Sequence, residues 1–175
     1  MTAALRHPIA VVQGEFMVSA DPDVQLSTIL GSCVAVCLHD PVAKLGGMNH
    51  FLLPFGQEEG TNRPVRYGAF AMEMLINALM KAGARKQRLQ AKLFGGARIS
   101  SDLRDIGQSN AAFARDFLAT ENIPCLAESL GGTNARRLIY QPTTGHARML
   151  LVPSSSVEPP PKPQPKPADA GIELF

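Results

Sequence analysis

The spacing of hydrophobic residues predicts one long helix in the middle of this chain. Between residues 65 and 84, apolar side chains recur every three or four positions and polar ones fall between them. The apolar stripe consists of Met72, Leu75, Ile76 and Leu79. We therefore expect a helix that packs one face on the core, with Gly83 as its stop signal.

Shorter apolar runs, bounded by turn-forming residues, predict strands over the rest of the chain. They cover residues 11–19, 24–30, 34–38, 48–53, 89–96, 123–132, 136–141 and 146–152. The last two are predicted to form a hairpin closed by Pro-Thr-Thr-Gly. The three Gly-Gly pairs, the first at residues 46–47, read as turns.

A second helix is predicted over residues 109–122, with Ser109 as its N-cap. Strands outnumber helices, and the hairpins imply antiparallel pairing. The predicted fold class is therefore mixed α/β, close to α+β. We expect a layered sandwich of largely antiparallel β-structure with two main helices packed on it, and not a doubly wound parallel sheet.

The chain divides into two parts by composition. Residues 1–152 read as one domain, and residues 153–175 as a proline-rich disordered tail, because its prolines disfavour helices and sheet ladders. The final Gly-Ile-Glu-Leu-Phe is apolar again. It reads either as a frayed end or as a short peptide that docks on a partner.

Composition narrows the function classes only slightly. A net charge of +2 among 175 residues does not predict binding to nucleic acid or to an anionic membrane. No apolar run is long enough to cross a bilayer, and the first residues lack a signal-peptide layout. Three cysteines, an odd number, predict reduced thiols and a cytoplasmic location.

The chemically richest segment is residues 30–54, which holds two of the three cysteines and two of the four histidines. It reads as a β-hairpin. If residue 33 lies opposite residue 50 or 52, Cys33 and His50 fall on one face of the sheet, about 5–8 Å apart. A register shifted by one residue separates them onto opposite faces.

Such a pair has a chemical use. A cysteine attacks as the thiolate, and a neighbouring imidazole can take its proton and return it to a leaving group. The Gly-Ser before Cys33 predicts a tight turn whose amides could face an oxyanion. The alternative is structural, because a buried cysteine is often a small apolar filler.

A metal site is the weaker interpretation of the same segment. Cys33, Cys37, His39 and His50 resemble a zinc pattern. However, residues 33 and 37 of one strand lie about 13 Å apart at about 3.3 Å per residue. They cannot share a tetrahedral ion with bonds near 2.3 Å. Cys37 and Cys125 read as core residues, and His39 as a residue at the rim of the hairpin.

Residues 9–152 resemble the CheD family of chemoreceptor glutamine deamidases. The matching sequence motifs are LGSCVAVCLHDP, GGMNHFLLP, YGAFAMEMLINALMKAGA, AKLFGGA, IGQSN and LGGTNARRLIYQPTTG. The resemblance implies that Cys33 is the nucleophile and His50 the catalytic histidine. The family's third member is a threonine six residues before the cysteine. Here Ser27 stands at that place and Thr28 beside it, so either hydroxyl is a candidate.

The resemblance further implies the activity and the partners. The expected reaction is hydrolysis of glutamines in methyl-accepting chemotaxis receptors to glutamate and ammonia, with backbone amides near Gly31 and Ser32 holding the oxyanion. No metal or organic cofactor is expected. A CheC-type phosphatase is an expected second partner. The alternative function is an adaptor that binds receptors or such a phosphatase with little catalysis.

Overall fold

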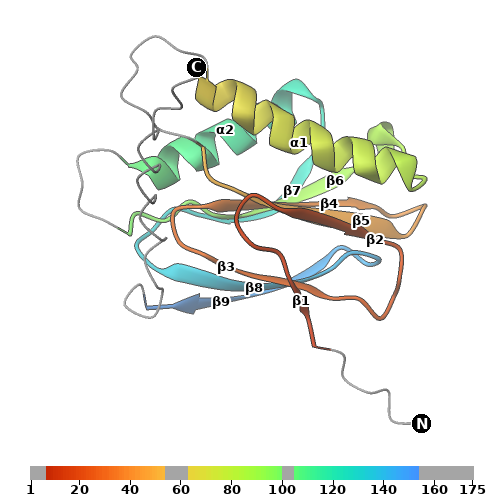
Figure 1. The fold of residues 1–175 in the computed structure, drawn as a ribbon, viewed down its shortest axis with the longest axis horizontal. Helices are drawn as coiled ribbons and strands as arrows, with labels where there is room; N and C mark the ends of the chain where they lie inside the picture. The colour runs from red at the N-terminus through yellow and green to blue at the C-terminus, as the bar shows by residue number, and fades with distance from the viewer. Residues whose placement is uncertain (1–6, 54–62, 100–104, 154–175) are drawn as a thin grey trace, which may run out of the picture.

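The computed structural model describes residues 7–53, 63–99 and 105–153. Three layers are stacked: two helices, a five-stranded sheet and a four-stranded sheet (Figure 1). The helices are α1 (Arg63–Lys81) and α2 (Ile106–Thr120), with a short 3-10 turn η1 (Lys86–Arg88) between them. This arrangement confirms the predicted layered α+β sandwich. No helix in the described part of the chain has the length and apolar character needed to span a membrane.

The five-stranded sheet lies in the middle layer, in the order β2-β5-β4-β6-β7. Its strands are β2 (Phe16–Ser19), β4 (Val34–Asp40), β5 (Leu45–Phe51), β6 (Gln90–Gly95) and β7 (Cys125–Leu130). The outer sheet has the order β1-β3-β8-β9. Its strands are β1 (Ile9–Ala10), β3 (Leu26–Leu30), β8 (Ala135–Gln141) and β9 (His146–Val152). Pairing is antiparallel except between β1 and β3 and between β6 and β7, which confirms the largely antiparallel prediction.

The middle sheet separates two hydrophobic cores. Val34, Val36 and Leu38 of β4 pack toward the helices, whereas Ala35 and Cys37 pack toward the outer sheet. Both faces of β4 and β5 are therefore covered, which explains why these strands are almost continuously buried. A polar side chain on β5 that points toward the outer sheet enters a largely dry space.

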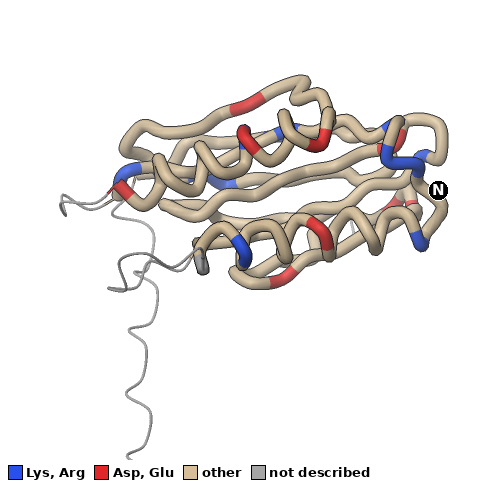
Figure 2. Tube along the Cα trace, turned by 90° about the horizontal axis from the view of Figure 1, so that it is seen from above, with Lys and Arg blue, Asp and Glu red and all other residues tan. Residues whose placement is uncertain are grey.

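Helix α1 confirms the periodicity argument. All four residues of the predicted stripe are buried, and the helix ends just before Gly83, whose φ of +113° fits a glycine stop signal. Seen from the helix side, basic and acidic positions are interspersed along the chain (Figure 2). That distribution agrees with the small net charge.

The predicted start of the second helix was wrong. Helix α2 begins at Ile106, three residues before Ser109, and its N-cap is Asp105, whose side chain accepts the amide of Gln108 at 3.0 Å. The hydroxyl of Ser109 instead lies 3.4 Å from the carbonyl of Asp105. Gly107 allows this early start, because a Cβ there would lie 2.3 Å from the carbonyl oxygen of Ala97, in the segment after β6.

Two further strand boundaries differ from the prediction. Strand β5 starts at Leu45, so Gly46 and Gly47 belong to the strand and not to the turn. They are glycines because a Cβ on Gly46 would lie 2.5 Å from the carbonyl oxygen of Pro142, and one on Gly47 would lie 2.7 Å from that of Met17.

The predicted strand over residues 11–19 is also interrupted. A tight turn at Gln13 and Gly14 separates β1 from β2, and the φ of +90° at Gly14 suits a glycine. The predicted tail, residues 153–175, lies outside the described residues except for Pro153, so its disorder and its docking role stay predictions.

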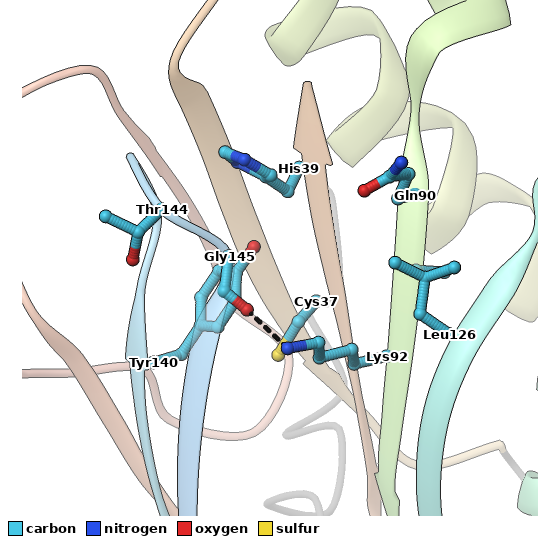
Figure 3. Close-up of a pocket in the computed structure, with 9 residues that line it drawn as sticks. Cys37, His39, Gln90, Lys92, Leu126, Tyr140, Thr144 and Gly145 are labelled. Atoms are coloured by element: carbon cyan, nitrogen blue, oxygen red, sulfur yellow. Dashed lines mark hydrogen bonds between the residues drawn. The ribbon is translucent and has the colours of Figure 1, made fainter. Parts of the chain in front are cut away.

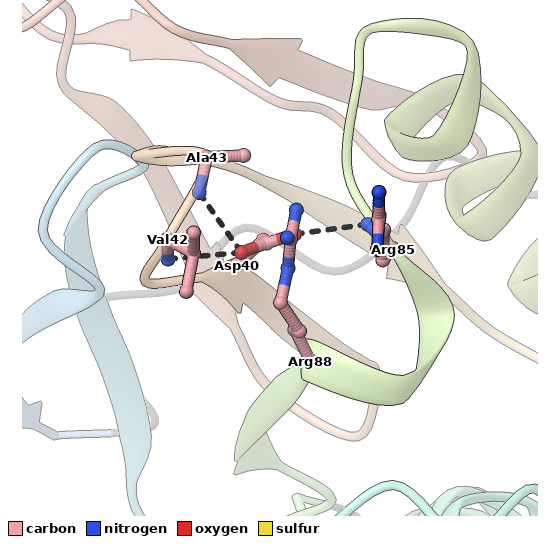
Figure 4. Close-up of polar contacts among 5 residues, drawn as sticks. All are labelled: Asp40, Val42, Ala43, Arg85 and Arg88. Carbon is pink, nitrogen blue, oxygen red and sulfur yellow. Dashed lines mark hydrogen bonds and ion pairs between the residues drawn. The ribbon is translucent and has the colours of Figure 1, made fainter.

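The turn of the β4–β5 hairpin is held to the connection after α1 by Asp40 (Figure 4). This carboxylate is fully buried and accepts the amides of Val42, Ala43 and Arg85 at 2.9–3.0 Å. It also pairs with the guanidinium of Arg88 at 2.8 Å. Burial acts to raise the pKa of Asp40, but these hydrogen bonds outweigh burial and lower the pKa to about 2. The network fixes the far end of the hairpin that carries the candidate site.

Candidate active site

Cys33 and His50 project from the middle sheet toward the outer sheet. Ala35 of β4 pairs with His50 of β5, and Cys33 lies two residues before Ala35. Cys33 is therefore on the same face of the sheet, one diagonal step from His50, where residues lie about 7–8 Å apart. This register is one of the two that the sequence allowed. The thiol packs against the core between the sheets, and His50 is only 7% exposed.

The imidazole of His50 is fixed by two groups from the outer-sheet side. Its Nδ1 lies 2.9 Å from Thr28 Oγ1 and 3.1 Å from the carbonyl oxygen of Val11. The Thr28 hydroxyl donates to that same carbonyl at 2.9 Å. Because a carbonyl oxygen only accepts, we assign the proton of the neutral imidazole to Nδ1.

The other ring nitrogen is then free to act as a base. His50 Nε2 is buried and has no hydrogen-bond partner among the described residues. A buried polar atom without a partner is costly and rare in folded proteins. The cost of leaving Nε2 unpaired is explained if this atom accepts a proton during a reaction. The sulfur of Cys33, the candidate proton donor, lies on the same face of the sheet.

Of the two candidate hydroxyls, Thr28 reaches the histidine and Ser27 does not. Burial alternates along β3, with Leu26, Thr28 and Leu30 buried and Ser27 and Ile29 on the outer side. Adjacent strand residues point to opposite faces, so a slip of one position decides which hydroxyl enters the site. The catalytic role of either hydroxyl remains a prediction.

Burial keeps both reactive groups neutral in the resting protein. It raises the pKa of the Cys33 thiol to about 11, and a hydrogen bond from the residue's own amide offsets only part of this effect. Burial also lowers the pKa of His50 below its usual 6.5, against the opposing effect of the Val11 carbonyl. At neutral pH the site therefore holds a thiol and an uncharged imidazole.

The loop that carries Cys33 is anchored through its carbonyl groups. The carbonyls of residues 31–33 accept, in turn, the amide of Ala97 at 3.0 Å, a side-chain amide of α2 at 2.8 Å, and the amide of Gly96 at 2.8 Å. In a planar trans peptide the N–H points opposite to the C=O. The amides of Ser32 and Cys33 therefore point away from these anchors, which keeps them as oxyanion candidates.

The side-chain amide that anchors this loop belongs to Asn110, which sequence reasoning did not single out. Asn110 is fully buried. Its Nδ2 donates to the carbonyl of Ser32 at 2.8 Å, and its Oδ1 accepts the amide of Leu53 at 3.0 Å. Asn110 thus ties the loop before Cys33 to the segment just after β5. The available signal was a polar side chain on the inner face of an amphipathic helix.

An open groove of about 170 Å³ lies on the helix side of β5, whereas the His50 imidazole points to the outer-sheet side. One wall is formed by β5, including His50, and by the turn before β2, and the other wall is formed by α1. Tyr67, Phe70 and Met74 of α1 line it, and all three are exposed, with Phe70 at 61%. Their helical spacing puts an apolar strip on the solvent side of α1.

A second cavity, of about 80 Å³, lies at the other end of the sheet (Figure 3). It contains Cys37, His39 and Lys92, and the amine of Lys92 donates to the carbonyl of Gly145 at 2.8 Å. Burial raises the pKa of Cys37. Four residues of extended strand, about 13 Å, separate Cys37 from Cys33. The structure therefore does not join these two cysteines in one site.

The potential metal ligands are likewise dispersed. Within residues 7–53, 63–99 and 105–153, no three His, Cys, Asp or Glu side chains lie together as metal ligands would. The prediction that Cys125 is a core residue was wrong, because it is exposed on β7, an edge strand of the middle sheet. All three cysteines are free thiols. Whether the reaction needs a cofactor is not decided by this arrangement and stays a prediction.

Fold and site together define a layered α+β protein with a candidate cysteine–histidine centre. A sequence profile described as CheD chemotactic sensory transduction matches residues 52–150. A probable chemoreceptor glutamine deamidase CheD of Caulobacter vibrioides is 49% identical over 173 residues, covering 95% of this chain and 92% of the relative. One of Rhizobium leguminosarum is 46% identical over 183 residues, covering 100% of both chains. The chain belongs to the CheD family.

The solved structures that resemble this chain are distant. A hypothetical protein of Bacillus licheniformis, YfiH, gives a TM-score of 0.44 at 16% identity, covering 65% of this chain and 49% of YfiH. YlmD of Geobacillus stearothermophilus gives a TM-score of 0.43 at 14% identity, covering 66% of this chain and 50% of YlmD. Similarity at this level adds nothing to the argument about function.

Proposed function

We propose that this protein is a cysteine-dependent glutamine deamidase that converts glutamines of chemotaxis receptors to glutamate. The observation that carries the proposal is the state of His50. Its Nδ1 is fixed by Thr28 and Val11, while its buried Nε2 has no partner in the described structure and faces the same side of the sheet as Cys33. The names of the relatives supply the substrate class.

The first half of the reaction breaks the amide bond. His50 Nε2 takes the thiol proton, and the sulfur attacks the side-chain carbonyl carbon of the target glutamine. A C–S bond forms, and the carbonyl oxygen becomes an oxyanion, which we expect backbone amides near Gly31, Ser32 and Cys33 to stabilise. The imidazolium then returns its proton to the nitrogen as the C–N bond breaks, which releases ammonia and leaves a thioester.

The second half uses the same groups on water. Nε2 removes a proton from a water molecule that attacks the thioester, and the C–S bond breaks as the thiol is re-formed. The product is glutamate, so each event adds one negative charge to the receptor. Such a charge change can bias the signalling state of a two-state protein.

The raised pKa of the thiol sets a cost that the mechanism must meet. A proton moved from a thiol with a pKa of about 11 to an imidazole with a pKa below 6.5 costs about 6 kcal/mol, before the attraction between the resulting thiolate and imidazolium is counted. A turnover of about one per second corresponds to a total barrier of about 17 kcal/mol. The transfer therefore fits within a normal enzymatic barrier without a preformed thiolate.

The exposed residues of α1 that line the groove on the helix side of β5 support a helical protein substrate. The exposed apolar strip of α1, with Phe70 at its centre, offers a surface for the apolar positions of such a helix. We expect Phe70→Glu to raise KM for a receptor fragment and to leave kcat nearly unchanged, whereas an equal loss in kcat would argue against a docking role.

The remaining expectations rest on the family resemblance. We propose a CheC-type phosphatase as a second partner and the cytoplasm as the location, and the three free thiols support a reducing compartment. Binding of receptors or of such a phosphatase without catalysis is the alternative function. A function in binding alone does not explain why Nε2 of His50 is left without a hydrogen-bond partner on the face of the sheet that carries Cys33.

Substitution of the nucleophile separates the two functions. Cys33→Ala is expected to abolish conversion of receptor glutamines, followed as a gain of about one dalton per site by mass spectrometry, and to leave partner binding intact. Cys125→Ser, at an exposed cysteine, is the matched control and should retain full activity. Conversion that persists in Cys33→Ala would refute the catalytic assignment and leave the adaptor function.

A further inference from the structure

Gln13 lies in a turn that sits against the candidate site. The amide of Glu15 donates to the carbonyl of Val12 at 3.0 Å, and Gly14 has a φ of +90°. These features are those of a type II turn, in which the third residue must adopt a positive φ. Gln13 occupies the second position of this turn and is exposed.

This turn is bonded directly to the backbone of the candidate catalytic histidine. Gly14 donates to the carbonyl of His50 at 2.8 Å, and the amide of His50 donates to the carbonyl of Glu15 at 3.0 Å. Val11, just before the turn, supplies the carbonyl that contacts His50 Nδ1. The position of Gln13 is therefore tied to the geometry of the site.

The carboxamide of Gln13 meets the thiol of Cys33. The thiol donates to Gln13 Oε1 at 3.5 Å, so its proton points to an amide oxygen and not to His50. Gln13 is exposed, so its side chain can leave without repacking the core. A glutamine side chain thus occupies the place beside the nucleophile that the proposed reaction needs for another glutamine side chain.

We propose that Gln13 is an intramolecular stand-in for the substrate. In the free protein its carboxamide covers Cys33, and a receptor glutamine displaces it on docking. The inference rests on the proposed function. The proposal predicts that free glutamine is a poor substrate, because a small molecule lacks the receptor surface whose binding energy would drive the exchange. We expect Gln13 itself to be spared, because the thiol donates to its carboxamide oxygen.

The first test needs no deamidase assay. The rate at which iodoacetamide alkylates Cys33 is measured at fixed pH by peptide mass mapping. Gln13→Ala should raise that rate about 2- to 10-fold, the effect of one lost hydrogen bond to the thiol. Gln13→Glu should lower it, because a carboxylate disfavours a neighbouring thiolate. Val12→Ala, at the exposed neighbour in the same turn, should leave it unchanged.

The second test uses a receptor fragment as substrate. Removal of an internal competitor should lower KM in Gln13→Ala by a similar factor and leave kcat unchanged. Equal alkylation rates and equal KM values in Gln13→Ala and the wild type would overturn the inference. So would conversion of Gln13 itself to glutamate in the resting protein, a gain of about one dalton that depends on Cys33.

The two tests fail separately from the proposed function. If no receptor glutamine is converted but alkylation responds to both substitutions as described, the carboxamide still covers Cys33 and the proposed function is wrong. If Cys33-dependent conversion is found and neither alkylation nor KM responds, the proposed function stands and the role of Gln13 is wrong.

Discussion

The hydroxyl of Thr28 offers the sharpest test of how the histidine is held. Thr28→Val keeps the branched shape and removes one oxygen that makes two contacts of 2.9 Å, one with the Val11 carbonyl and one with His50 Nδ1. The residue is 7% exposed, so water does not readily replace the lost contacts. At about 1 kcal/mol for each net hydrogen bond, we expect the free energy of unfolding to fall by about 1–2 kcal/mol.

The expected catalytic effect of Thr28→Val is moderate. After the substitution, Nδ1–H can still donate to the Val11 carbonyl, 3.1 Å away, so the correct tautomer stays favoured. Loss of one orienting contact worth about 1.4 kcal/mol corresponds to about a tenfold fall in kcat. The assay is conversion of glutamine in a receptor fragment, followed by mass spectrometry under saturating substrate.

Two variants serve as controls for this measurement. Thr28→Ser keeps the hydroxyl and should keep most of the activity, and Ser27→Ala, on the other side of β3, should keep all of it. Full activity in Thr28→Val together with a strong loss in Ser27→Ala would refute the reasoning. It would assign the third role to Ser27 and make the observed contact of His50 incidental.

Three further predictions concern the support of the site. Asn110→Ala should lower the free energy of unfolding by about 2–4 kcal/mol and reduce kcat, because two buried backbone groups lose their partner. An unchanged free energy of unfolding in denaturant titrations, together with an unchanged kcat, would contradict the anchoring role. Alkylation of Cys33 should rise about tenfold per pH unit from pH 7 to 10, since the thiolate is the reactive form and its pKa is about 11; a plateau near pH 7 would indicate a preformed thiolate. Asp40→Asn should cost about 2 kcal/mol at neutral pH. Because the pKa of Asp40 is depressed from 3.8 to about 2, its difference in stability from the wild type should shrink as pH falls through that interval, and a constant difference would contradict the assigned pairing.

The features that sequence predicted best are those set by local periodicity. The stripe of α1 appears in the chain because a helix repeats every 3.6 residues, and all four of its residues are buried. Turn position and side-chain alternation limited Cys33 and His50 to one shared face or two opposite faces of the sheet, and the observed strand register gives the shared face.

The features that sequence missed depend on contacts between distant segments. Gly46 and Gly47 look like turn residues, but they are strand residues because neighbouring backbones approach closely. Asn110 is 78 residues from the carbonyl that it anchors. Gln13 lies 20 residues from Cys33, inside a run that read as one continuous strand. No local pattern encodes these approaches, since they arise only when strands, turns and helices that are distant in sequence pack together.

The same limit explains the choice between the two adjacent hydroxyls. Sequence spacing favoured Ser27 through the family pattern and left Thr28 open. Side-chain alternation along β3 places only Thr28 between the sheets. A one-residue difference in spacing is small in an alignment, but it reverses the direction of a strand side chain.

The protonation state of His50 is the most direct test of the account. Long-range proton–nitrogen NMR spectra of protein labelled at histidine nitrogens, with the signal assigned through a His50→Gln variant, report which ring nitrogen carries the proton. We predict a neutral ring at pH 7, protonated at Nδ1 and bare at Nε2, that becomes charged only below the usual pKa of 6.5. A ring protonated at Nε2, or an imidazolium at pH 7, would contradict the account, because neither form could take the thiol proton of Cys33.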